Sequence, residues 1–231
     1  MSYFSAHNIN KTFRSFNLSV SFEAEKGTFT CIVGPSGSGK STALRIIAGL
    51  EKSDAEIFLD GKNITKLSPG KKNIGFVFQQ PSLFMNMNVE KNILFGLKNR
   101  GIKKEEQKKI CSLLLKKTGL EGFEKRNPSE LSGGEEQRVA IARTLAVKPK
   151  LILLDEPFSA LDIVNRSELL VLLKSLQKNE GITFIMVTHD LEEAKKVSDK
   201  IILLKDGRIE FDGNASDFKD EFMTGIKTEL R

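Results

Sequence analysis

The hydrophobic pattern at the start of the chain is that of short strands with one helix among them. Runs rich in β-branched and aromatic residues occur at 19–22, 28–33, 57–59 and 74–78, and such runs predict strands. From Ser41 to Leu50 the apolar residues recur at helical spacing, which predicts a helix. The N-terminal part is therefore expected to be mostly β-structure around this helix.

The pattern becomes helical from about residue 88 to 146. Two apolar stripes at helical spacing carry this signal: Val89, Ile93, Leu94 and Leu97, followed by Ile110, Leu113, Leu114 and Leu115. Each stripe predicts a helix that buries one face, so this part is expected to be a helical segment inserted in the chain.

Strand and helix signals alternate in the last third of the chain. Strands are predicted at 151–154, 182–187 and 201–204, and helical stretches at 166–177 and 190–197. Such alternation predicts a parallel sheet with crossover helices. The pair Asp206-Gly207 between two apolar runs predicts a hairpin after the last of these strands. The fold class is therefore expected to be α/β.

Charge changes this picture at one place only. The chain has 231 residues and a net charge of +6. The segment 98–117 alone contains eight basic and two acidic residues, a balance of 8 − 2 = +6. A nucleic-acid interface would normally add aromatic residues or a recognition motif, and the segment has neither. A solvated helix face is the favoured interpretation, and no nucleic-acid partner is expected.

Composition excludes several other classes. The apolar stretches fall far short of the roughly 18 residues that a membrane span needs, and no secretory signal pattern opens the chain. Cys31 and Cys111 lie far apart without a partner pattern, which argues against structural zinc, haem attachment and a disulfide framework. A cytosolic protein is the default expectation.

A glycine-rich loop lies between a predicted strand and a predicted helix and matches G-x-x-x-x-G-K-[ST]. Its residues are Gly34, Pro35, Ser36, Gly37, Ser38, Gly39, Lys40, Ser41 and Thr42. The glycines allow backbone N–H groups to turn around phosphate oxygens, and the helix N-terminus adds its positive dipole. Lys40 can reach the β- and γ-phosphates of a nucleoside triphosphate, and the Ser41 hydroxyl can hold Mg²⁺. The alternative is a Gly-Ser turn before an ordinary helix.

A pair of acids follows the apolar strand at 151–154. Asp155 is expected beside the loop at 34–42, where its carboxylate can orient Mg²⁺. Glu156 can accept a proton from an attacking water, which separates a hydrolase from a protein that only binds nucleotide. Two surface acids capping the next helix are the alternative, which the preceding aliphatic residues weaken.

A second helix start with glycines occurs at Leu131 to Arg138. Ser132 suits an N-cap, and Gly133 and Gly134 open the helix behind it. The arrangement predicts a second anion-binding helix terminus, and a capped helix with an unusual glycine pair is the alternative. The chain would bind one triphosphate but has two such helix termini. This suggests that the second terminus contacts a nucleotide bound by another copy of the chain.

Taken in order, these motifs resemble those of the ATP-binding-cassette family, the nucleotide-hydrolysing subunits of membrane transporters. The resemblance covers about residue 3 to 213 and includes Gln79 after Phe76-Val77-Phe78, the signature at 131–135, Ser159-Ala160-Leu161-Asp162 and His189. It implies a P-loop NTPase (RecA-like) core with a parallel sheet, an N-terminal antiparallel β subdomain and an inserted helical subdomain. The single domain 1–231 would then consist of a core at 1–85 and 147–231 and a helical subdomain at 86–146 that carries the signature.

The resemblance also implies roles for single residues. Phe13 would stack on adenine, with Phe16 as a rival, and Gln79 would sense Mg²⁺ and the γ-phosphate. Mg²⁺ would be held by Ser41, Gln79 and Asp155. Catalysis would rest on Glu156, His189, Lys40 and Gln79. The opposite subunit's ATP would be contacted by Ser132, Gly133 and Gly134, and Asp162 would cross the dimer interface.

The function implied is ATP hydrolysis that powers import of a small nutrient or ion of the thiamine, oxyanion or polyamine kind. The partners implied are a second copy or a similar subunit, membrane permease subunits and an extracytoplasmic substrate-binding protein, with the chain peripheral on the cytoplasmic face of the membrane. A soluble ATPase of this family uncoupled from transport is the alternative, and a P-loop kinase is disfavoured by the signature and Glu156. Many importer subunits have a Pro-His pair near Met85-Asn86, and this chain does not.

Overall fold

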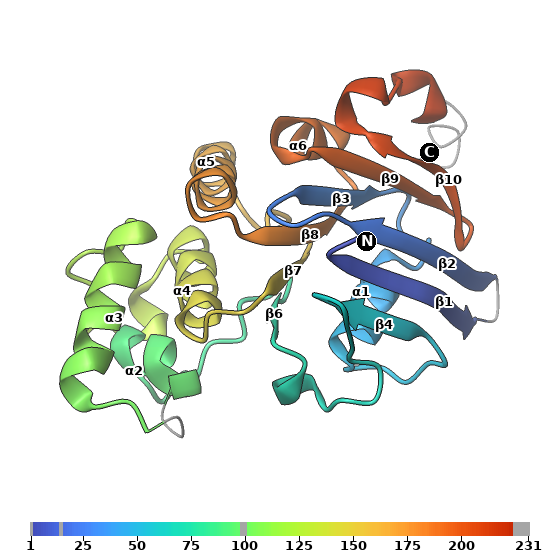
Figure 1. Cartoon of the computed structure of the whole chain (residues 1–231). Helices are drawn as coiled ribbons and strands as arrows, with labels where there is room; N and C mark the ends of the chain where they lie inside the picture. The colour runs from blue at the N-terminus through green and yellow to red at the C-terminus, as the bar shows by residue number, and fades with distance from the viewer. Residues whose placement is uncertain (1, 14–15, 98–100, 224–231) are drawn as a thin grey trace.

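The computed structural model describes residues 2–13, 16–97 and 101–223, and a six-stranded sheet forms its centre (Figure 1). The strand order is β10-β9-β3-β8-β7-β6. The strands are β3 (Phe29–Val33), β6 (Ile74–Val77), β7 (Leu151–Asp155), β8 (Thr183–Thr188), β9 (Lys200–Lys205) and β10 (Arg208–Asn214). All neighbouring strands are parallel except β9 and β10, which form the predicted hairpin at Asp206-Gly207.

A smaller antiparallel sheet is built from the N-terminal residues, in the order β2-β1-β4-β5. Its strands are β1 (Phe4–Thr12), β2 (Asn17–Ala24), β4 (Glu56–Leu59) and β5 (Lys62–Asn63). The strand β1 was not predicted. It pairs with both β2 and β4, so backbone pairing on two sides fixes a segment whose own pattern is weak.

Alternate residues of the central strands pack into two separate hydrophobic cores. Leu151 and Leu153 pack with α1 (Lys40–Ala48) and the antiparallel sheet. Ile152 and Leu154 pack into the core formed with the other helices. Because successive side chains of a strand point to opposite faces, β7 is buried along its whole length. This double burial explains why these strands are nearly continuous apolar runs.

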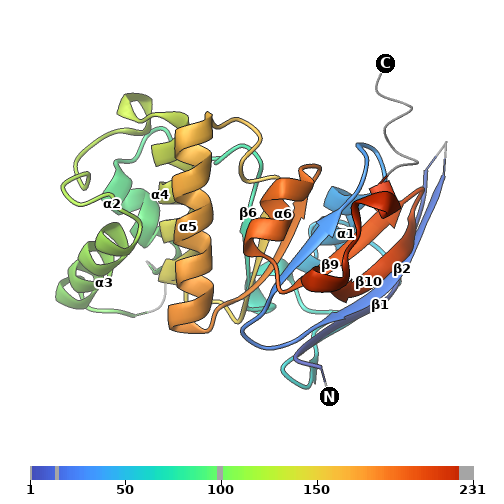
Figure 2. The ribbon, with the colours of Figure 1, turned by 90° about the horizontal axis from the view of Figure 1, so that it is seen from above.

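The remaining helices lie on the face of the central sheet opposite α1 and to one side of the sheet. They are α2 (Val89–Leu94), α3 (Lys104–Lys117), α4 (Gly133–Ala146), α5 (Ile163–Glu180) and α6 (Leu191–Val197). Short 3₁₀ turns occur at η1 (Pro69–Lys71), η2 (Phe95–Leu97), η3 (Pro128–Glu130), η4 (Ala215–Asp217) and η5 (Asp220–Met223). The helices α2, α3 and α4 form a group beside the sheet, and α5 stands between that group and α6 (Figure 2). The α/β class is confirmed, whereas the subdomain boundaries at 86 and 146 stay a prediction.

The helix α3 corrects one detail of the sequence interpretation. Leu113 is 53% exposed, although it was predicted to belong to the apolar stripe. The buried face of α3 consists instead of Cys111, Leu114 and Leu115, because residues three and four apart share a helix face. Lys98 and Arg100 of the basic segment lie outside the described residues.

The two cysteines are free and buried. Burial raises the pKa of the Cys111 thiol to about 12, so this thiol stays protonated at neutral pH. Among the described residues, no helix is both long and apolar enough to cross a bilayer.

Candidate functional site

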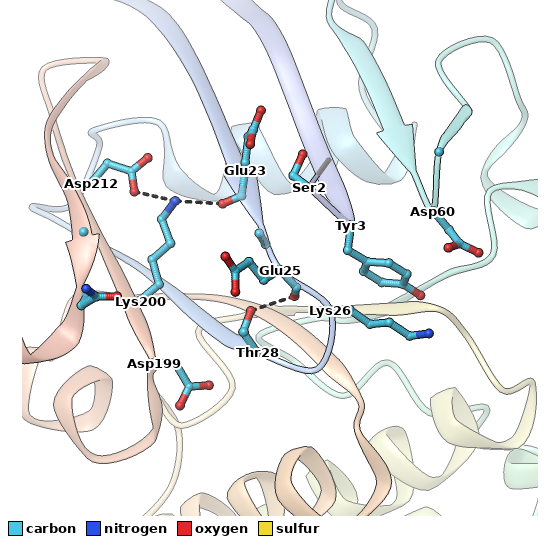
Figure 3. A pocket seen from close by; sticks show the side chains of 14 residues that line it. Ser2, Tyr3, Glu23, Glu25, Lys26, Thr28, Asp60, Asp199, Lys200 and Asp212 are labelled. Carbon is cyan, nitrogen blue, oxygen red and sulfur yellow. Dashed lines mark hydrogen bonds and ion pairs between the residues drawn. The ribbon is translucent and has the colours of Figure 1, made fainter.

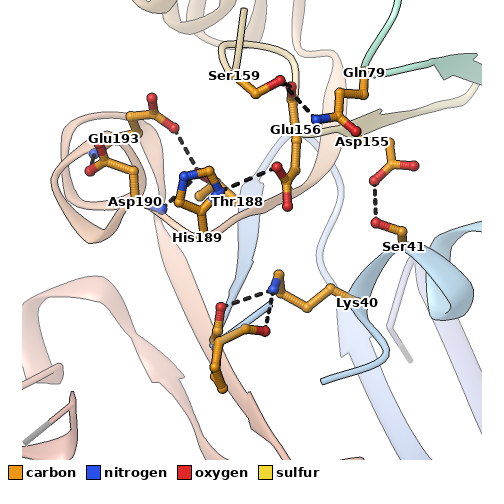
Figure 4. Close-up of polar contacts among 12 residues, drawn as sticks. Lys40, Ser41, Gln79, Asp155, Glu156, Ser159, Thr188, His189, Asp190 and Glu193 are labelled. Atoms are coloured by element: carbon orange, nitrogen blue, oxygen red, sulfur yellow. Dashed lines mark hydrogen bonds and ion pairs between the residues drawn. The ribbon is translucent and has the colours of Figure 1, made fainter. Parts of the chain in front are cut away.

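Four adjacent strands of the central sheet bring part of the predicted site together at their carboxyl ends. The glycine-rich loop follows β3, Gln79 follows β6, the acids Asp155 and Glu156 end β7, and His189 follows β8. Since parallel strands end on the same side of a sheet, their carboxyl ends form a common rim. Figure 4 shows the side chains of Gln79, Asp155, Glu156 and His189 around this rim, above Lys40.

Backbone conformation shapes the loop at 34–42. Gly34, Gly37 and Gly39 all have positive φ angles, of 152°, 80° and 101°. A Cβ atom at Gly34 would lie 2.0 Å from the Leu204 carbonyl oxygen, so only glycine fits there. Gly39 caps α1 without any side-chain hydrogen bond to the helix. The first N–H groups of α1 are therefore left for an anion.

The Lys40 ammonium group is held inside this loop. Its Nζ donates hydrogen bonds to the carbonyl oxygens of Gly34 and Pro35, each at 2.8 Å. Burial lowers the pKa of Lys40, although the nearby charges of Glu156 and Asp155 act in the opposite direction. A buried cation at a helix N-terminus favours a bound anion such as a phosphate group.

Oxygen atoms suited to a magnesium ion lie next to the loop. The Ser41 hydroxyl donates a 2.6 Å hydrogen bond to Oδ1 of the buried Asp155, and Mg²⁺ prefers such hard oxygen ligands. Within the described part of the chain, the buried Ser38 Oγ has no hydrogen-bond partner. No group of three or more His, Cys, Asp or Glu side chains in that part could hold a metal. Ser41 and Asp155 supply two hard oxygen ligands side by side, and a Mg²⁺ ion held by them would take its other ligands from phosphate oxygens and water.

Glu156 adopts an unusual backbone conformation. Its φ is +45°, a region that costs a non-glycine residue about 1–3 kcal/mol and is concentrated at functional sites. Its N–H donates to the Val187 carbonyl oxygen at 3.0 Å, which fixes the turn against β8. The carboxylate Oε2 then lies 3.2 Å from Nδ1 of His189. This geometry suits a general base held in place by an imidazole.

Gln79 joins the same group through a serine. Its Nε2 donates to Ser159 Oγ at 3.1 Å, and this hydroxyl donates to the Glu156 carbonyl oxygen at 3.1 Å. The predicted sensor glutamine is therefore two hydrogen bonds from the backbone of the predicted base.

The second helix terminus lies elsewhere. Ser132 caps α4 in a capping box, since its Oγ accepts from the Glu135 N–H at 3.3 Å and its own N–H donates to Glu135 Oε2 at 2.7 Å. A Cβ atom at Gly134 would lie 2.5 Å from Asn165 Oδ1, and one at Gly133 would lie 3.9 Å from Leu161. The signature thus packs against the start of α5. These contacts do not include the loop that holds Lys40.

Asp162 caps α5 at that same place. Its Oδ1 accepts from the N–H groups of Val164 and Asn165, at 3.0 and 2.9 Å. The hydrogen bonds from Asn165 lower the pKa of Asp162. The structure thus gives Asp162 a capping role within its own chain, and its predicted position at a dimer interface stays a prediction.

Both candidate adenine-stacking residues lie near the phosphate loop. The rings of Phe13 and Phe16 stack with centroids 4.7 Å apart. The Phe16 ring approaches within 3.5 Å of the position that a Cβ on Gly39 would take, so Phe16 lies next to the loop. Phe13 stacks on Phe16. Either ring can offer a face to a base.

The sequence interpretation missed the residues that surround His189. Thr188 donates to Glu193 Oε2 at 2.7 Å, and Nη1 of Arg166 lies 3.4 Å from Glu193 Oε1. A signal was available, because Asp190 begins a helix as its N-cap and Glu193 stands three residues later, a spacing typical of helix starts.

A separate hollow of about 970 Å³ lies away from the rim, between the N-terminal residues, β2, β9 and β10. Figure 3 shows its charged lining, with Lys200 between Asp212 and the Glu23 carbonyl oxygen. None of the predicted site residues lines it.

A strand, a glycine-rich loop around a buried lysine, and a carboxylate at the end of β7, which β8 separates from β3, define a P-loop nucleotide-binding protein. The chain belongs to the ABC transporter family, whose model matches residues 18–159.

Individual proteins show the same likeness. The chain is 48% identical over 202 residues to "Sulfate/thiosulfate import ATP-binding protein CysA" of Nocardia farcinica (strain IFM 10152), covering 87% of this chain and 61% of that protein. It therefore spans about three-fifths of that relative's length.

Two solved structures match over most of their length. The ATP-binding cassette MJ0796, a dimer in a post-hydrolysis state bound to ADP and Pi, has a TM-score of 0.79 and 36% identity, with 93% of this chain and 100% of that chain covered. The protein cbiO1 from Clostridium perfringens, part of the ABC transporter complex cbiONQ, has a TM-score of 0.85 and 31% identity, with 99% and 96% covered. The predicted family and P-loop fold are thus confirmed.

Proposed function

We propose that the chain binds ATP with Mg²⁺ and hydrolyses it to ADP and phosphate. The observation that carries this proposal is that three separate contacts meet at one rim: Lys40 in its loop, Ser41 with Asp155, and Glu156 with His189. A protein that only binds nucleotide would need the first three of these residues, but it would not need a base aimed by an imidazole. The ADP and Pi in the MJ0796 structure support the same reaction.

Each residue of the rim has a distinct task in this reaction. Lys40 binds the terminal phosphates in the loop, and Ser41 and Asp155, with Gln79, hold the Mg²⁺. The bound ion would neutralise charge on the phosphate oxygens. Glu156 accepts the proton of the attacking water, and His189 orients the Glu156 carboxylate and contacts the γ-phosphate.

A dimer would complete each site. Ser132 and Gly133 are exposed at the start of α4, and Gly134 is buried directly behind them. These three residues would face the ATP of a second copy, across an interface that includes Asp162. The serine hydroxyl and the start of α4 would supply hydrogen-bond donors to that γ-phosphate. The dimeric state of MJ0796 supports this arrangement.

The hydrolysis cycle would drive import through membrane permease subunits, with the chain peripheral on the cytoplasmic face of the membrane. The named functions of the relatives support an importer: one is described as a sulfate/thiosulfate import protein and another as part of a transporter complex. Among the small nutrients and ions considered, an oxyanion is favoured by the first of these names. A substrate-binding protein outside the membrane would deliver it.

Phosphate release from purified protein tests the enzymatic core of the proposal. The Glu156→Gln variant is expected to bind ATP as the wild type does, to release phosphate at least roughly 100-fold more slowly, and to remain dimeric with ATP on a sizing column. Glu25→Gln, which neutralises an exposed acid remote from the rim, is the matched control. Unchanged turnover in Glu156→Gln would show that another group is the base.

A further inference from the structure

Two helices that flank the site, α5 and α6, are joined by ion pairs at both ends of α6. At its N-terminal end, Nη1 of Arg166 lies 3.5 Å from Asp190 Oδ2 and 3.4 Å from Glu193 Oε1. At its C-terminal end, Lys174 Nζ donates to the Val197 carbonyl oxygen at 2.8 Å and to Asp199 Oδ1 at 3.0 Å. Both cations come from α5, so the two contacts form a natural pair for comparison.

The contact at the N-terminal end surrounds His189. Thr188 precedes the histidine and donates to Glu193 Oε2 at 2.7 Å. Asp190 follows it, and its N–H donates to Thr188 Oγ1 at 3.0 Å. Thr188 and Asp190, the two chain neighbours of His189, are thus hydrogen-bonded to each other, and Glu193 accepts from Thr188. Arg166 pairs with both Asp190 and Glu193, and Figure 4 shows the residues around the imidazole.

Burial makes this arrangement sensitive to the loss of either partner. Glu193 is only 6% exposed, and burial raises its pKa, against the opposing effects of the Thr188 hydrogen bond and the Arg166 charge. A buried carboxylate that loses its cation is strongly destabilised in its charged form. The turn carrying His189 would then have to rearrange.

Arg166 lies in the first turn of α5 and also contacts the Leu161-Asp162 segment that precedes this helix. Its N–H donates to the Asp162 carbonyl oxygen at 2.9 Å, and its Nη2 lies 3.4 Å from the carbonyl oxygen of Leu161. Glu156, Ser159, Arg166, Thr188, His189, Asp190 and Glu193 line one small shared cavity. Arg166 thus touches both the Leu161-Asp162 segment and the His189 turn.

We propose that Arg166 and Glu193 are positioning residues of the hydrolytic site. Their ion pair keeps the His189 imidazole against the Glu156 carboxylate and ties its position to the Leu161-Asp162 segment. Neither side chain touches the reacting atoms. A displacement of about 1 Å in a catalytic group can cost roughly 100-fold in rate, so the pair is expected to affect turnover more than nucleotide binding.

The test compares Arg166→Met with Lys174→Met in the full chain, by phosphate release and by ATP affinity. Arg166→Met is expected to lower kcat roughly 10- to 100-fold with the Kd for ATP changed less than about threefold. Lys174→Met cuts the matched contact at the other end of α6 and is expected to leave kcat within about twofold. Arg166→Lys keeps a cation and is expected to recover part of the rate.

Glu193→Gln, which keeps an acceptor for Thr188 but loses the charge, should resemble Arg166→Met. The double variant should be no slower than the slower single variant, because both changes break one contact. Equal losses in Arg166→Met and Lys174→Met, or independent losses in the double variant, would overturn the inference. It rests on the proposed hydrolysis, and the two fail differently: an inactive wild type refutes the hydrolase, whereas an active wild type with an equally active Arg166→Met refutes the positioning role.

Discussion

The two helix N-termini that the sequence marks as anion sites differ in how their own chain satisfies them. The terminus of α1 follows Gly39, which offers no side chain, and has no acid in its first turn. The terminus of α4 is closed by Ser132 and by Glu135, and two acids lie in its first turn. A free terminus attracts an anion through its N–H groups and dipole, whereas a capped terminus with acids has lost part of that attraction.

This difference explains a division of labour between the two regions. The α1 terminus, with Lys40 inside its loop, is built to hold phosphates by itself. The α4 terminus offers the Ser132 hydroxyl and the backbone of Gly133, which a ligand can approach closely. Such a terminus suits a contact that forms only after a phosphate has bound at the P-loop of the other copy. A dimer whose P-loop binds first and whose signature closes later follows from this contrast.

The largest expected effect is at the α1 terminus. Lys40→Ala removes the cation that would face the terminal phosphates, and ATP affinity is expected to fall roughly 100-fold or more, because a buried charged partner is lost. Lys71→Ala, at an exposed lysine, is the control and should bind normally. Equilibrium binding with a fluorescent ATP analogue measures both. Normal binding by Lys40→Ala would remove the proposed task of the loop.

At the α4 terminus, Ser132→Arg is expected to spare ATP binding but to lower phosphate release more than about tenfold, because a long cation would fill the contact with the opposite ATP. Ser132→Thr keeps the capping oxygen and should remain active.

Mixing inactive chains sharpens the comparison between the two termini. A mixed pair of Lys40→Ala and Ser132→Arg chains contains one site in which both the P-loop and the signature are intact. Activity is therefore expected to rise on mixing above that of either chain alone, as a two-fold interface with shared sites requires. Two sites each built from a single chain would show no such recovery.

A smaller effect is expected where α4 meets α5. A Cβ atom at Gly134 would lie 2.5 Å from Asn165 Oδ1, so Gly134→Ala must shift the signature or the start of α5. We expect a roughly three- to tenfold loss of kcat, with a lowered Tm. The second change Asn165→Ala removes the two nearest atoms and leaves the Cβ of residue 165 at 3.0 Å, so it should relieve most of the clash and return part of the rate. A double variant as slow as Gly134→Ala would place the effect outside this contact.

The smallest effect concerns charge alone. Glu135→Gln keeps the capping geometry but removes a negative charge from the α4 terminus, where a dipole interaction is worth about 0.3–1 kcal/mol. The KM for ATP is expected to fall by roughly two- to fivefold, whereas Glu130→Gln, on the preceding turn, should leave it unchanged. A raised KM would mean that Glu135 itself assists the nucleotide.

Much of the fold and site could be predicted because it depends on local patterns. Apolar runs with acids at their ends marked β7, and the motif around Lys40 marked the phosphate loop, since both signals lie within a few residues. The strand β1 and the exposed Leu113 could not be predicted, because each depends on what neighbouring elements cover. The candidate site residues were named from the sequence, but their mutual distances were not.

The sequence by itself determined the chemistry available to this protein: a lysine in a glycine loop, a carboxylate at a strand end, a base beside it and a serine-capped helix. Only the tertiary structure decided which of these meet. The parallel order of β3, β8, β7 and β6 gathers the first three at one rim, and the packing of α4 on α5 holds the fourth apart. The strained turn at Glu156 and the Arg166–Glu193 pair also belong to this second kind. The spacing of Asp190 and Glu193 marks a helix start, but no local pattern names Arg166, which is distant in sequence, as the partner of Glu193.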